Sequence, residues 1–518
     1  MKTTWRAWAA AGLTVAMALN SGAATRTWTG AAGDGKASTA GNWSPNGAPG
    51  DTDDILLDST SSSNLTWDAA ATNLVASWLQ TADYGGTVRV ATVYVGKGAF
   101  TNFTIAGDCT IGNGVWSHRD NSTTESNKLD LAVNGNLTIA ANAIITADAL
   151  GYDGNQGPGR GTVLFDSGGH GGIGGFTSGN GPSSATYGSI TSPTNLGSGG
   201  TYDGANCGGG AVRLTVTGVL TNNGIISANG VGPGQSAGAG GSVWITAGAL
   251  AGSGIIRANG GDDWRCSGGG GRVAVIVTNS GAAFSDYSGA LSAYGGVQGV
   301  RGAAGTVYRE TAAEAGGHGT LVVNNNGSAT AGGVHTLMPT AVDLGDFAEV
   351  IVTNRGNLAV NADDTLDFGT VSLRGAGASS SRVTIVSAAG VTFPNPFTIS
   401  NYTLAVDGLT SVTGDWTLVT NSALSHSDNT YNETYKMDLT IHGSLTIESN
   451  GAINVDALGY NAQSGPGKTW TLFEGAGHGG LGGFNSTSGP TTATYGSILT
   501  PTNIGSGGGW YQGETDGG

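Results

Sequence analysis

Cysteine and charged residues are scarce in this sequence, and each scarcity excludes a class of protein. The chain has 3 cysteines among 518 residues, an odd number, so a disulfide framework cannot hold the fold together. Charged residues make up 11% of the chain, too few for a coiled coil or a charge-rich disordered protein. The 20 Lys and Arg residues are outnumbered by 36 Asp and Glu residues, so we expect no nucleic-acid partner.

Long apolar runs are missing except at the N-terminus. Lys2 and Arg6 precede the apolar run Ala7–Leu19, and small residues follow it up to Ala24. This order predicts a secretory signal peptide over residues 1–24, too short to span a membrane; a buried N-terminal helix is the alternative. No other run approaches the roughly 20 apolar residues of a membrane span. We therefore expect an exported chain without a transmembrane segment, located outside the cell or at its surface.

Glycine, by contrast, is abundant, with 95 residues and no Gly-X-Y period, which excludes collagen. The chain also contains a long internal repeat. Lys128–Gly200 aligns without a gap to Lys436–Gly508, and more than half of the aligned residues are identical. Both copies contain Asp-Ala-Leu-Gly-Tyr, a Gly-His-Gly-Gly block and Ala-Thr-Tyr-Gly-Ser-Ile. Duplication of a whole module explains this pattern, so we expect both copies to adopt the same backbone.

A shorter repeat predicts the fold class. The runs Ala211–Val216, Ser242–Ala247 and Arg272–Val277 start roughly 30 residues apart, and apolar residues recur at alternate positions in each. Period-2 alternation is typical of strands with one buried face, and a unit this small buries that face only by stacking on its neighbours. We therefore predict an all-β solenoid of stacked parallel strands. Tandem β-sandwiches are the alternative.

The alternation also predicts which side chains are buried in the stacked strands: Val212, Leu214, Val216, Val243, Ile245, Val273, Val275 and Val277. The Gly-rich segments 154–210 and 462–518 have little of this alternation. They are either flexible linkers or long side loops, and the repeated contexts of His170 and His478 favour side loops that project from the strands. Cys207 and Cys266 lie in Gly-rich segments, and whether they pair stays open.

These patterns divide the chain into five parts. Residues 1–24 are the signal peptide, and residues 25–100 are an N-terminal β region or cap. The remaining parts are a first module (101–327, with the Gly-rich loop 154–210), connecting strands (328–407) and a second module (408–518) that repeats 101–209 in truncated form. The sequence stops where its next strand unit should begin, so we expect a C-terminally truncated fragment.

Several motifs carry a resemblance to known proteins. Thr27–Gly30 is followed by Gly41–Gly47 and Pro49–Asp58, and the Gly-rich strand pattern continues through Lys128–Ile139 and Ser227–Ile256. In these motifs the chain resembles the Gly-rich β-helical repeat proteins of bacterial surfaces, giant adhesin-like or autotransporter-type exported proteins. The resemblance implies a right-handed parallel β-helix and a surface-associated role. It carries no established catalytic residues.

Two patterns near the N-terminus resemble ligand sites, one for phosphate and one for calcium, but each lacks residues that such a site requires. Gly30–Lys36 has the spacing of a phosphate-binding loop, but Ala37 replaces the Ser or Thr that would hold Mg²⁺, and we expect no strand before it. A cluster of carboxylates could suit calcium, although the loop glycine and distal glutamate of an EF-hand are missing. We interpret this cluster as a solvated turn before a strand; its members are Asp51, Asp53, Asp54 and Asp58.

Histidines recur at corresponding positions of the two copies. His118 and His426 each precede an aspartate by two positions, and His170 and His478 each lie between glycines. No spacing typical of a metal site joins them. We interpret the imidazoles as partners of backbone groups in Gly-rich turns.

Carbohydrate is the expected ligand if the chain binds one, because exposed aromatic rings stack on sugar faces. The tryptophans after the signal peptide either pack loops onto the strands or line an exposed groove; they include Trp28, Trp43, Trp67, Trp78, Trp116, Trp244, Trp264, Trp416, Trp470 and Trp510. We predict a secreted, surface-associated structural or adhesin-like protein whose partners are extracellular polysaccharide or cell-surface components. We assign no catalytic, cofactor-binding or metal-binding residue. The alternatives are a polysaccharide-active β-helix enzyme (a lyase or hydrolase) and a carbohydrate-binding array.

Overall fold

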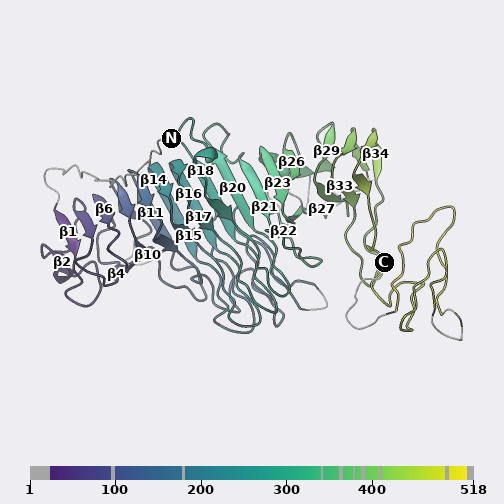
Figure 1. Cartoon of the computed structure of the whole chain (residues 1–518), viewed down its shortest axis with the longest axis horizontal. Coiled ribbons are helices and arrows are strands. Elements are labelled where there is room, and N and C mark those ends of the chain that lie inside the picture. The colour runs from purple at the N-terminus through teal and green to yellow at the C-terminus, as the bar shows by residue number, and fades with distance from the viewer. Residues whose placement is uncertain are drawn as a thin grey trace, which may run out of the picture.

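The computed structural model describes residues 24–94, 100–177, 181–339, 342–360, 366–376, 380–386, 391–407, 411–484, 489 and 491–509. The expected signal peptide up to residue 23, and residues 510–518, lie outside the described residues. Within them the protein is all-β, and its strands pair mainly in parallel (Figure 1). The described helices are three short 3-10 turns, η1 (Ala40–Asn42), η2 (Phe284–Asp286) and η3 (Leu344–Asp346). None of them is long and apolar enough to cross a lipid bilayer.

The largest sheet contains 16 strands and forms one wall of the molecule. Its main path joins, in order, β2 (Trp43–Ser44), β1 (Thr25–Trp28), β3 (Asp54–Leu57), β6 (Ser77–Gln80), β9 (Cys109–Ile111), β12 (Leu137–Ile139), β14 (Ala211–Asn222), β16 (Ser242–Ala251), β18 (Arg272–Val277), β20 (Thr306–Thr311), β21 (Thr320–Asn324), β23 (Glu349–Thr353) and β26 (Ser372–Ala376). Beside this path lie β5 (Leu74–Val75), β8 (Phe103–Ile105) and β11 (Leu129–Val133). From β3 to β20 the neighbours are parallel and other strands intervene in the chain, because parallel pairing needs a crossover connection.

A second sheet of seven parallel strands faces the first part of this wall. Its strands are β4 (Leu65–Trp67), β7 (Thr87–Val90), β10 (Gly114–Ser117), β13 (Ala143–Thr146), β15 (Ile225–Ser227), β17 (Ile255–Arg257) and β19 (Ala290–Ser292). Alternate side chains of the two sheets form one hydrophobic core, in which Ile145, Ile226 and Ile256 join Leu214 and Val243. We call strands β1 to β20 the first stack.

The burial predicted from the alternation is confirmed in the first stack. Val212 of β14 pairs in parallel register with Val243 of β16, which pairs with Val273 of β18. All eight residues expected to be buried are at most 2% exposed. Parallel pairing of this kind differs from the antiparallel pairing of a β-sandwich, so the tandem-sandwich alternative does not fit.

The core moves to the opposite face of the large sheet where β20 meets β21. These strands pair antiparallel, with Val307 opposite Val322, whereas the pairs on either side are parallel. Val307 belongs to the first core, but its neighbour Tyr308 belongs to a second core together with Leu321 and Val323. Because adjacent residues of a strand point to opposite faces, β20 has one face in each core.

The second core lies between β21, β23 and β26 and a parallel six-stranded sheet. That sheet contains β22 (Thr336–Leu337), β24 (Asn357–Val360), β27 (Ser381–Ile385), β30 (Tyr402–Ala405), β33 (Ser422–Ser425) and β36 (Gly451–Ile453). Smaller parallel sheets join β25 (Leu366–Asp367) with β28 (Val391–Thr392), β29 (Phe397–Ile399) with β32 (Trp416–Leu418) and β35 (Leu445–Ile447), and β31 (Ser411–Thr413) with β34 (Thr440–His442). We call strands β21 to β36 the second stack.

The two copies of the long repeat share their local conformation. In the first copy the carbonyl of His170 accepts a 2.9 Å hydrogen bond from the N–H of Tyr187, and in the second copy His478 and Tyr495 make the same bond at 2.9 Å. The ring centroids of both pairs are 4.6 Å apart. These contacts agree with the expected common backbone in the loops around both histidines. The copies differ at the strand before the loops, which is Leu129–Val133 in the first copy and Thr440–His442 in the second.

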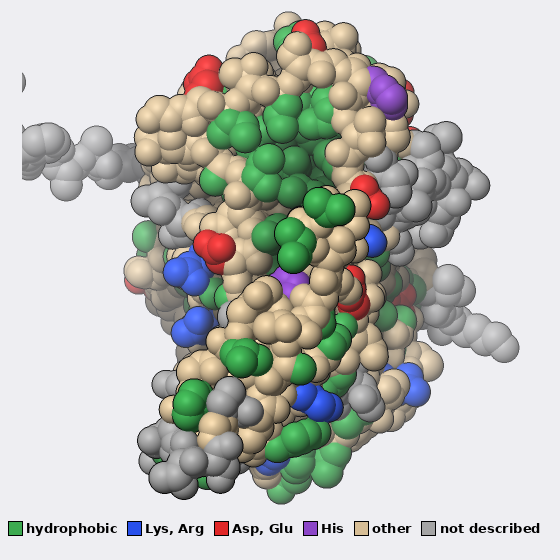
Figure 2. All heavy atoms as spheres, turned by 90° about the vertical axis from the view of Figure 1, so that its right-hand side faces the viewer, with side chains coloured by type: hydrophobic (Ala, Val, Ile, Leu, Met, Phe, Trp, Pro, Cys, Tyr) green, Lys and Arg blue, Asp and Glu red, His purple; other side chains and the backbone are tan. Residues whose placement is uncertain are grey.

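The two copies differ in what covers them. Leu445 and Ile447 of β35 are 38% and 45% exposed. Figure 2, which views the molecule from the right-hand side of Figure 1, shows hydrophobic side chains gathered on that face. The first-copy counterparts of these two residues, Leu137 and Ile139 in β12, are fully buried, because β12 pairs with β14 in the first stack. Among the described residues, β35 pairs on one side, with β32.

The Gly-rich loop 154–210 lies beside later loops on one side of the sheets (Figure 1). The N–H groups of Gly171 and Gly172 both donate to the carbonyl of Gly270 at 2.9 Å. A Cβ on Gly268 would lie 2.0 Å from the carbonyl oxygen of Gly238, so this packing excludes side chains there. The linker alternative does not fit these contacts. The expected side loop lies in a layer with its neighbours, which we call the glycine layer (residues 154–177, 181–210, 229–241, 259–271 and 294–305).

Candidate functional site

A surface pocket of about 510 Å³ lies in the second copy of the long repeat. Its volume falls within the range of about 300–1,000 Å³ that is common for small-molecule sites. Two segments supply its walls, and we call it the aromatic pocket; the lining residues are Tyr431, Asn461, Ala462, Gln463, Ser464, Gly465, Lys468 and Trp470.

Asn429 fixes the segment that carries Tyr431. Its side-chain amide donates to the carbonyls of Tyr435 and Leu458, each at 2.9 Å, and its oxygen accepts from the N–H of Thr434 at 2.8 Å. Asn121 makes the corresponding bonds in the first copy, to the carbonyls of Asn127 and Leu150. Tyr431 therefore occupies the same backbone position as Thr123, two residues beyond Asn121.

Backbone contacts fix the second wall in the same way. The N–H of Gln463 donates to the carbonyl of Gly508 at 2.9 Å, and the N–H of Lys468 donates to the carbonyl of Gly465 at 3.3 Å. Gly465 has a φ of +91°, and a Cβ there would lie 2.5 Å from the ring of Tyr460, so this turn requires glycine. The turn brings Gln463 and Lys468 to one pocket.

Both aromatic rings of the pocket are open to solvent. Tyr431 is 69% and Trp470 is 68% exposed. The first copy has Thr123 and Thr162 at these positions, and both threonines are exposed although later strands cover that copy. The two rings are therefore exposed because of where these positions lie on the repeat, and not because later strands are missing from the second copy.

The pocket combines stacking surfaces with hydrogen-bonding groups. The ammonium of Lys468 lies 4.5 Å from the ring centroid of Trp470, a cation–π contact that holds the indole in place. Asn461 and Gln463 supply amides that both donate and accept hydrogen bonds, and Ser464 supplies a hydroxyl. This set of groups suits a ligand with an apolar face and polar edges.

Most tryptophans named from the sequence lie in the cores. Trp28, Trp43, Trp67, Trp78, Trp116 and Trp416 are at most 3% exposed, and the first five form a chain of edge-on ring contacts. Trp244 is half-buried beside Arg213, Trp264 is 66% exposed, and Trp510 lies outside the described residues. Six of the described tryptophans therefore follow the packing alternative, and Trp470 lines the aromatic pocket. Tyr431 and Lys468 were not named from the sequence.

The histidines contact backbone carbonyls, as interpreted from the sequence. Nδ1 of His118 lies 2.6 Å from the carbonyl of Arg119, Nδ1 of His426 lies 2.7 Å from that of Ser427, and Nδ1 of His170 lies 2.9 Å from that of Gly240. A carbonyl only accepts, so Nδ1 carries the proton in each case. Burial lowers the pKa of His118 to about 4 and that of His170 to about 3, with the charge of Arg272 adding to the shift at His170.

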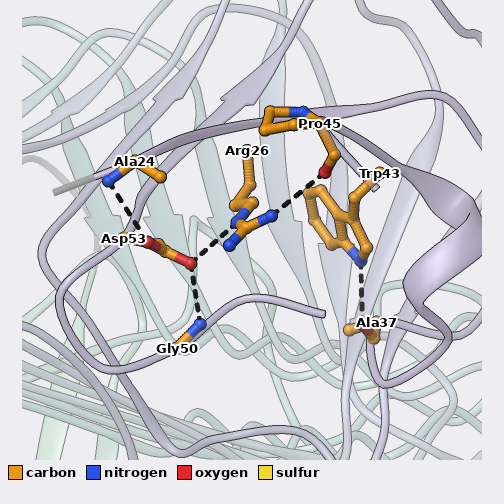
Figure 3. Close-up of polar contacts among 7 residues, drawn as sticks. All are labelled: Ala24, Arg26, Ala37, Trp43, Pro45, Gly50 and Asp53. Carbon is orange, nitrogen blue, oxygen red and sulfur yellow. Dashed lines mark hydrogen bonds and ion pairs between the residues drawn. The ribbon is translucent and has the colours of Figure 1, made fainter. Parts of the chain in front are cut away.

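The acidic residues near the N-terminus tie the first strands together (Figure 3). Asp53 accepts hydrogen bonds from the N–H groups of Ala24 and Gly50, at 3.3 and 3.0 Å, and from Nε of Arg26 at 2.8 Å. Burial acts to raise the pKa of Asp53, but these hydrogen bonds and the charge of Arg26 outweigh it and lower the pKa below its ordinary value. The expected turn is present at residues 51–52, but the cluster is not solvated as a whole, because Asp53 and Asp54 are buried and Asp54 is the first residue of β3.

One expectation about the phosphate-loop string Gly30–Lys36 is wrong, because β1 ends at Trp28 directly before it. Turns and η1 follow the string in place of an α-helix. The N–H of Lys36 donates to the carboxylate of Asp34 at 3.1 Å, so this backbone donor is already paired within the string.

The cysteines and acidic groups supply no further site in the described part of the chain. Cys109, Cys207 and Cys266 are free, so the open question of a Cys207–Cys266 pair is answered against pairing. No group of three His, Cys, Asp or Glu side chains among the described residues is arranged to hold a metal ion.

A second hollow of about 390 Å³ opens where the first core ends. Phe284, Tyr287 and Tyr294 line one side, and Arg309 of β20 and Ile351 of β23 line the other. The seven-stranded sheet ends at β19, while the large sheet continues through β21. The hollow therefore follows from the change of core, because the former core face continues there without an opposing sheet.

A comparison of the chain with protein-family models, curated proteins and solved structures finds no match.

Proposed function

We propose that the chain is a secreted, surface-associated structural or adhesin-like protein, built as a right-handed parallel β-helix with Gly-rich side loops. In this proposal the two facing parallel sheets of the first stack are walls of the helix, and each unit of about 30 residues adds one layer. The second repeat then displays the aromatic pocket to a partner outside the cell.

One observation carries the proposal: the duplicated repeat has diverged at its surface while its framework is unchanged. The framework contacts of Asn121 and Asn429 match, yet the exposed Thr123 is replaced by Tyr431 and the exposed Thr162 by Trp470. Exposed aromatic residues are costly in solubility and are enriched where proteins bind partners. A constant framework with one altered surface is what a display protein needs.

Export is tested with the full chain in a bacterial host. We expect the protein in the medium or at the cell surface, where external protease cleaves it, and Leu13→Arg, which interrupts the apolar run Ala7–Leu19, should retain it inside. Equal retention of both forms would refute the export part of the proposal.

Attachment is tested with purified protein on immobilised bacterial or host cells. The double variant Tyr431→Thr/Trp470→Thr restores the residues of the first repeat, so we expect it to fold and to lose attachment. Trp264→Thr removes another exposed indole and is the matched control that should attach normally. If the double variant attaches as well as the control, the pocket is not the contact site.

A further inference from the structure

We propose that the aromatic pocket is a saccharide-binding site that takes a pyranose unit of a polysaccharide, with Trp470 and Tyr431 as its stacking surfaces. This inference rests on the proposed function and names the ligand class of the same site. It concerns the chemistry of one pocket, which the following contacts define.

The rings are placed to receive the apolar face of a sugar. The C–H groups on one face of a pyranose form a flat apolar patch, which packs on an indole or phenol ring of similar size. Trp470 and Tyr431 are more than two-thirds exposed, and they line one pocket although 39 positions separate them. The ammonium of Lys468 lies 4.5 Å from the ring centroid of Trp470. This contact restricts the orientation of the indole before a ligand arrives.

The polar groups match the hydroxyl edge of a sugar. A sugar hydroxyl both donates and accepts, and the side-chain amides of Asn461 and Gln463 offer both functions within the pocket. The first repeat has Asp153 and Asn155 at the corresponding positions, so divergence replaced one acceptor-only carboxylate by an amide. Removal of that charge suits a ligand rich in hydroxyl groups. The cation is kept, because Lys468 stands where the first repeat has Arg160.

The first repeat shows that the pocket is not a by-product of the fold. Its backbone follows the same path through Asn155 and Gly157, with φ values of 64° and 97° against 58° at Gln463 and 91° at Gly465. With Thr123 and Thr162 it lacks the two rings, so the same backbone offers no stacking surface. The binding groups of the second repeat are therefore side-chain changes on a constant backbone.

Calorimetric titration of the full chain with cellohexaose, maltohexaose and a galacturonic-acid hexamer tests the inference. We expect at least one of these oligosaccharides to bind with a Kd in the range of about 1 µM to 1 mM, and the stoichiometry to be one. Tyr431→Thr/Trp470→Thr should weaken that binding by at least about tenfold, and Lys468→Gln should weaken binding of the acidic hexamer more than that of the neutral ones. Trp264→Thr is the matched control and should bind like the natural chain.

A transplant provides the converse test. Thr123→Tyr/Thr162→Trp places both rings on the first repeat, and together with Asp153→Asn it should raise the stoichiometry from one towards two. Circular dichroism checks that each variant is folded, and exposed positions on a constant backbone should tolerate these changes.

The outcomes separate the inference from the proposed function. No binding of any of the three hexamers at about 10 mM, or equal binding by the natural chain and Tyr431→Thr/Trp470→Thr, would overturn the saccharide inference. If that double variant at the same time lost attachment to cells, the display function would stand with a ligand of another class. Saccharide binding by a chain that is never exported would support the pocket and contradict the proposed function.

Discussion

A single methyl group at Gly268 tests whether the glycine layer holds the first stack together. In Gly268→Ala the new Cβ would lie 2.0 Å from the carbonyl oxygen of Gly238 and 2.6 Å from its carbonyl carbon. Ordinary van der Waals contact begins at 3.4 Å, so backbone has to move by more than an ångström. No flexible side chain is available to yield, because the obstructing atoms are backbone.

The movement costs hydrogen bonds as well as space. The N–H of Gly268 donates to the carbonyl of Gly261, and its carbonyl accepts from the N–H of Gly296, both at 2.9 Å. Overpacking costs about 1–3 kcal/mol and each buried polar group left without a partner about 1–3 kcal/mol, while the lower entropy of the unfolded alanine chain returns about 0.4–1 kcal/mol. With one of these groups left without a partner, we expect a net loss of about 1–6 kcal/mol.

The control lies in the same layer. A Cβ on Gly204 would meet no atom within 4 Å, so Gly204→Ala should leave stability unchanged or raise it by less than about 1 kcal/mol. Repeat structures do not always unfold in one step, so amide hydrogen exchange of residues 229–305 is measured beside the unfolding midpoint in guanidinium chloride. Equal midpoints and equal exchange in the two variants would refute the reasoning, since the close approach at Gly238 would then have no energetic consequence.

Three other predictions follow from buried groups. Because the pKa of His170 is lowered from 6.5 to about 3, the unfolded chain binds more protons than the folded chain between these pH values, and the free energy of unfolding falls as the pH drops through this window. The variant His170→Gln should lose less stability between pH 7 and pH 5 than the natural chain. An equal loss in both proteins would contradict the lowered pKa. Trp116→Phe keeps an aromatic ring but removes the 2.9 Å hydrogen bond from Nε1 to Gln80, so unfolding should become easier by about 1–3 kcal/mol, whereas Trp264→Phe at the surface should change little. Burial raises the pKa of Cys109, so Ellman's reagent should modify this thiol only after denaturation, and rapid reaction in the folded protein would contradict its burial.

The sequence was sufficient for the first stack because its signal is local. Alternation in Val212–Val216 specifies a buried face wherever the strand lies, and the restart of the pattern about every 30 residues specifies its neighbours. The change of core at β20 could not be predicted in this way. Val307 and Tyr308 are adjacent, and both are large enough to be buried, so the alternation gives no preferred face. The face is decided by the antiparallel return from β20 to β21, which depends on tertiary packing.

The candidate site could be predicted only in part for a similar reason. Trp470 was named as an aromatic residue beside a Gly-rich turn, but composition did not separate it from Trp116 or Trp78, which fill the core. Tyr431 lies far from Trp470 in the sequence, and the fold brings them to one pocket. A position-by-position comparison of the two repeat copies would have found both, because each replaces an exposed threonine on an otherwise similar framework.

The position of β20, with one face in each core, has a mechanical consequence. Two stacks joined by a peptide linker can swing relative to each other, but here the junction is a hydrogen-bonded pair, β20 and β21, within one continuous sheet. Bending at this point would open the contacts of Val307 on one side or of Tyr308 on the other. A tensile load along the sheet would therefore pass from one stack to the other through backbone hydrogen bonds. The second stack is thus joined to the first by paired backbone and by core side chains on both faces of β20, and not by a linker.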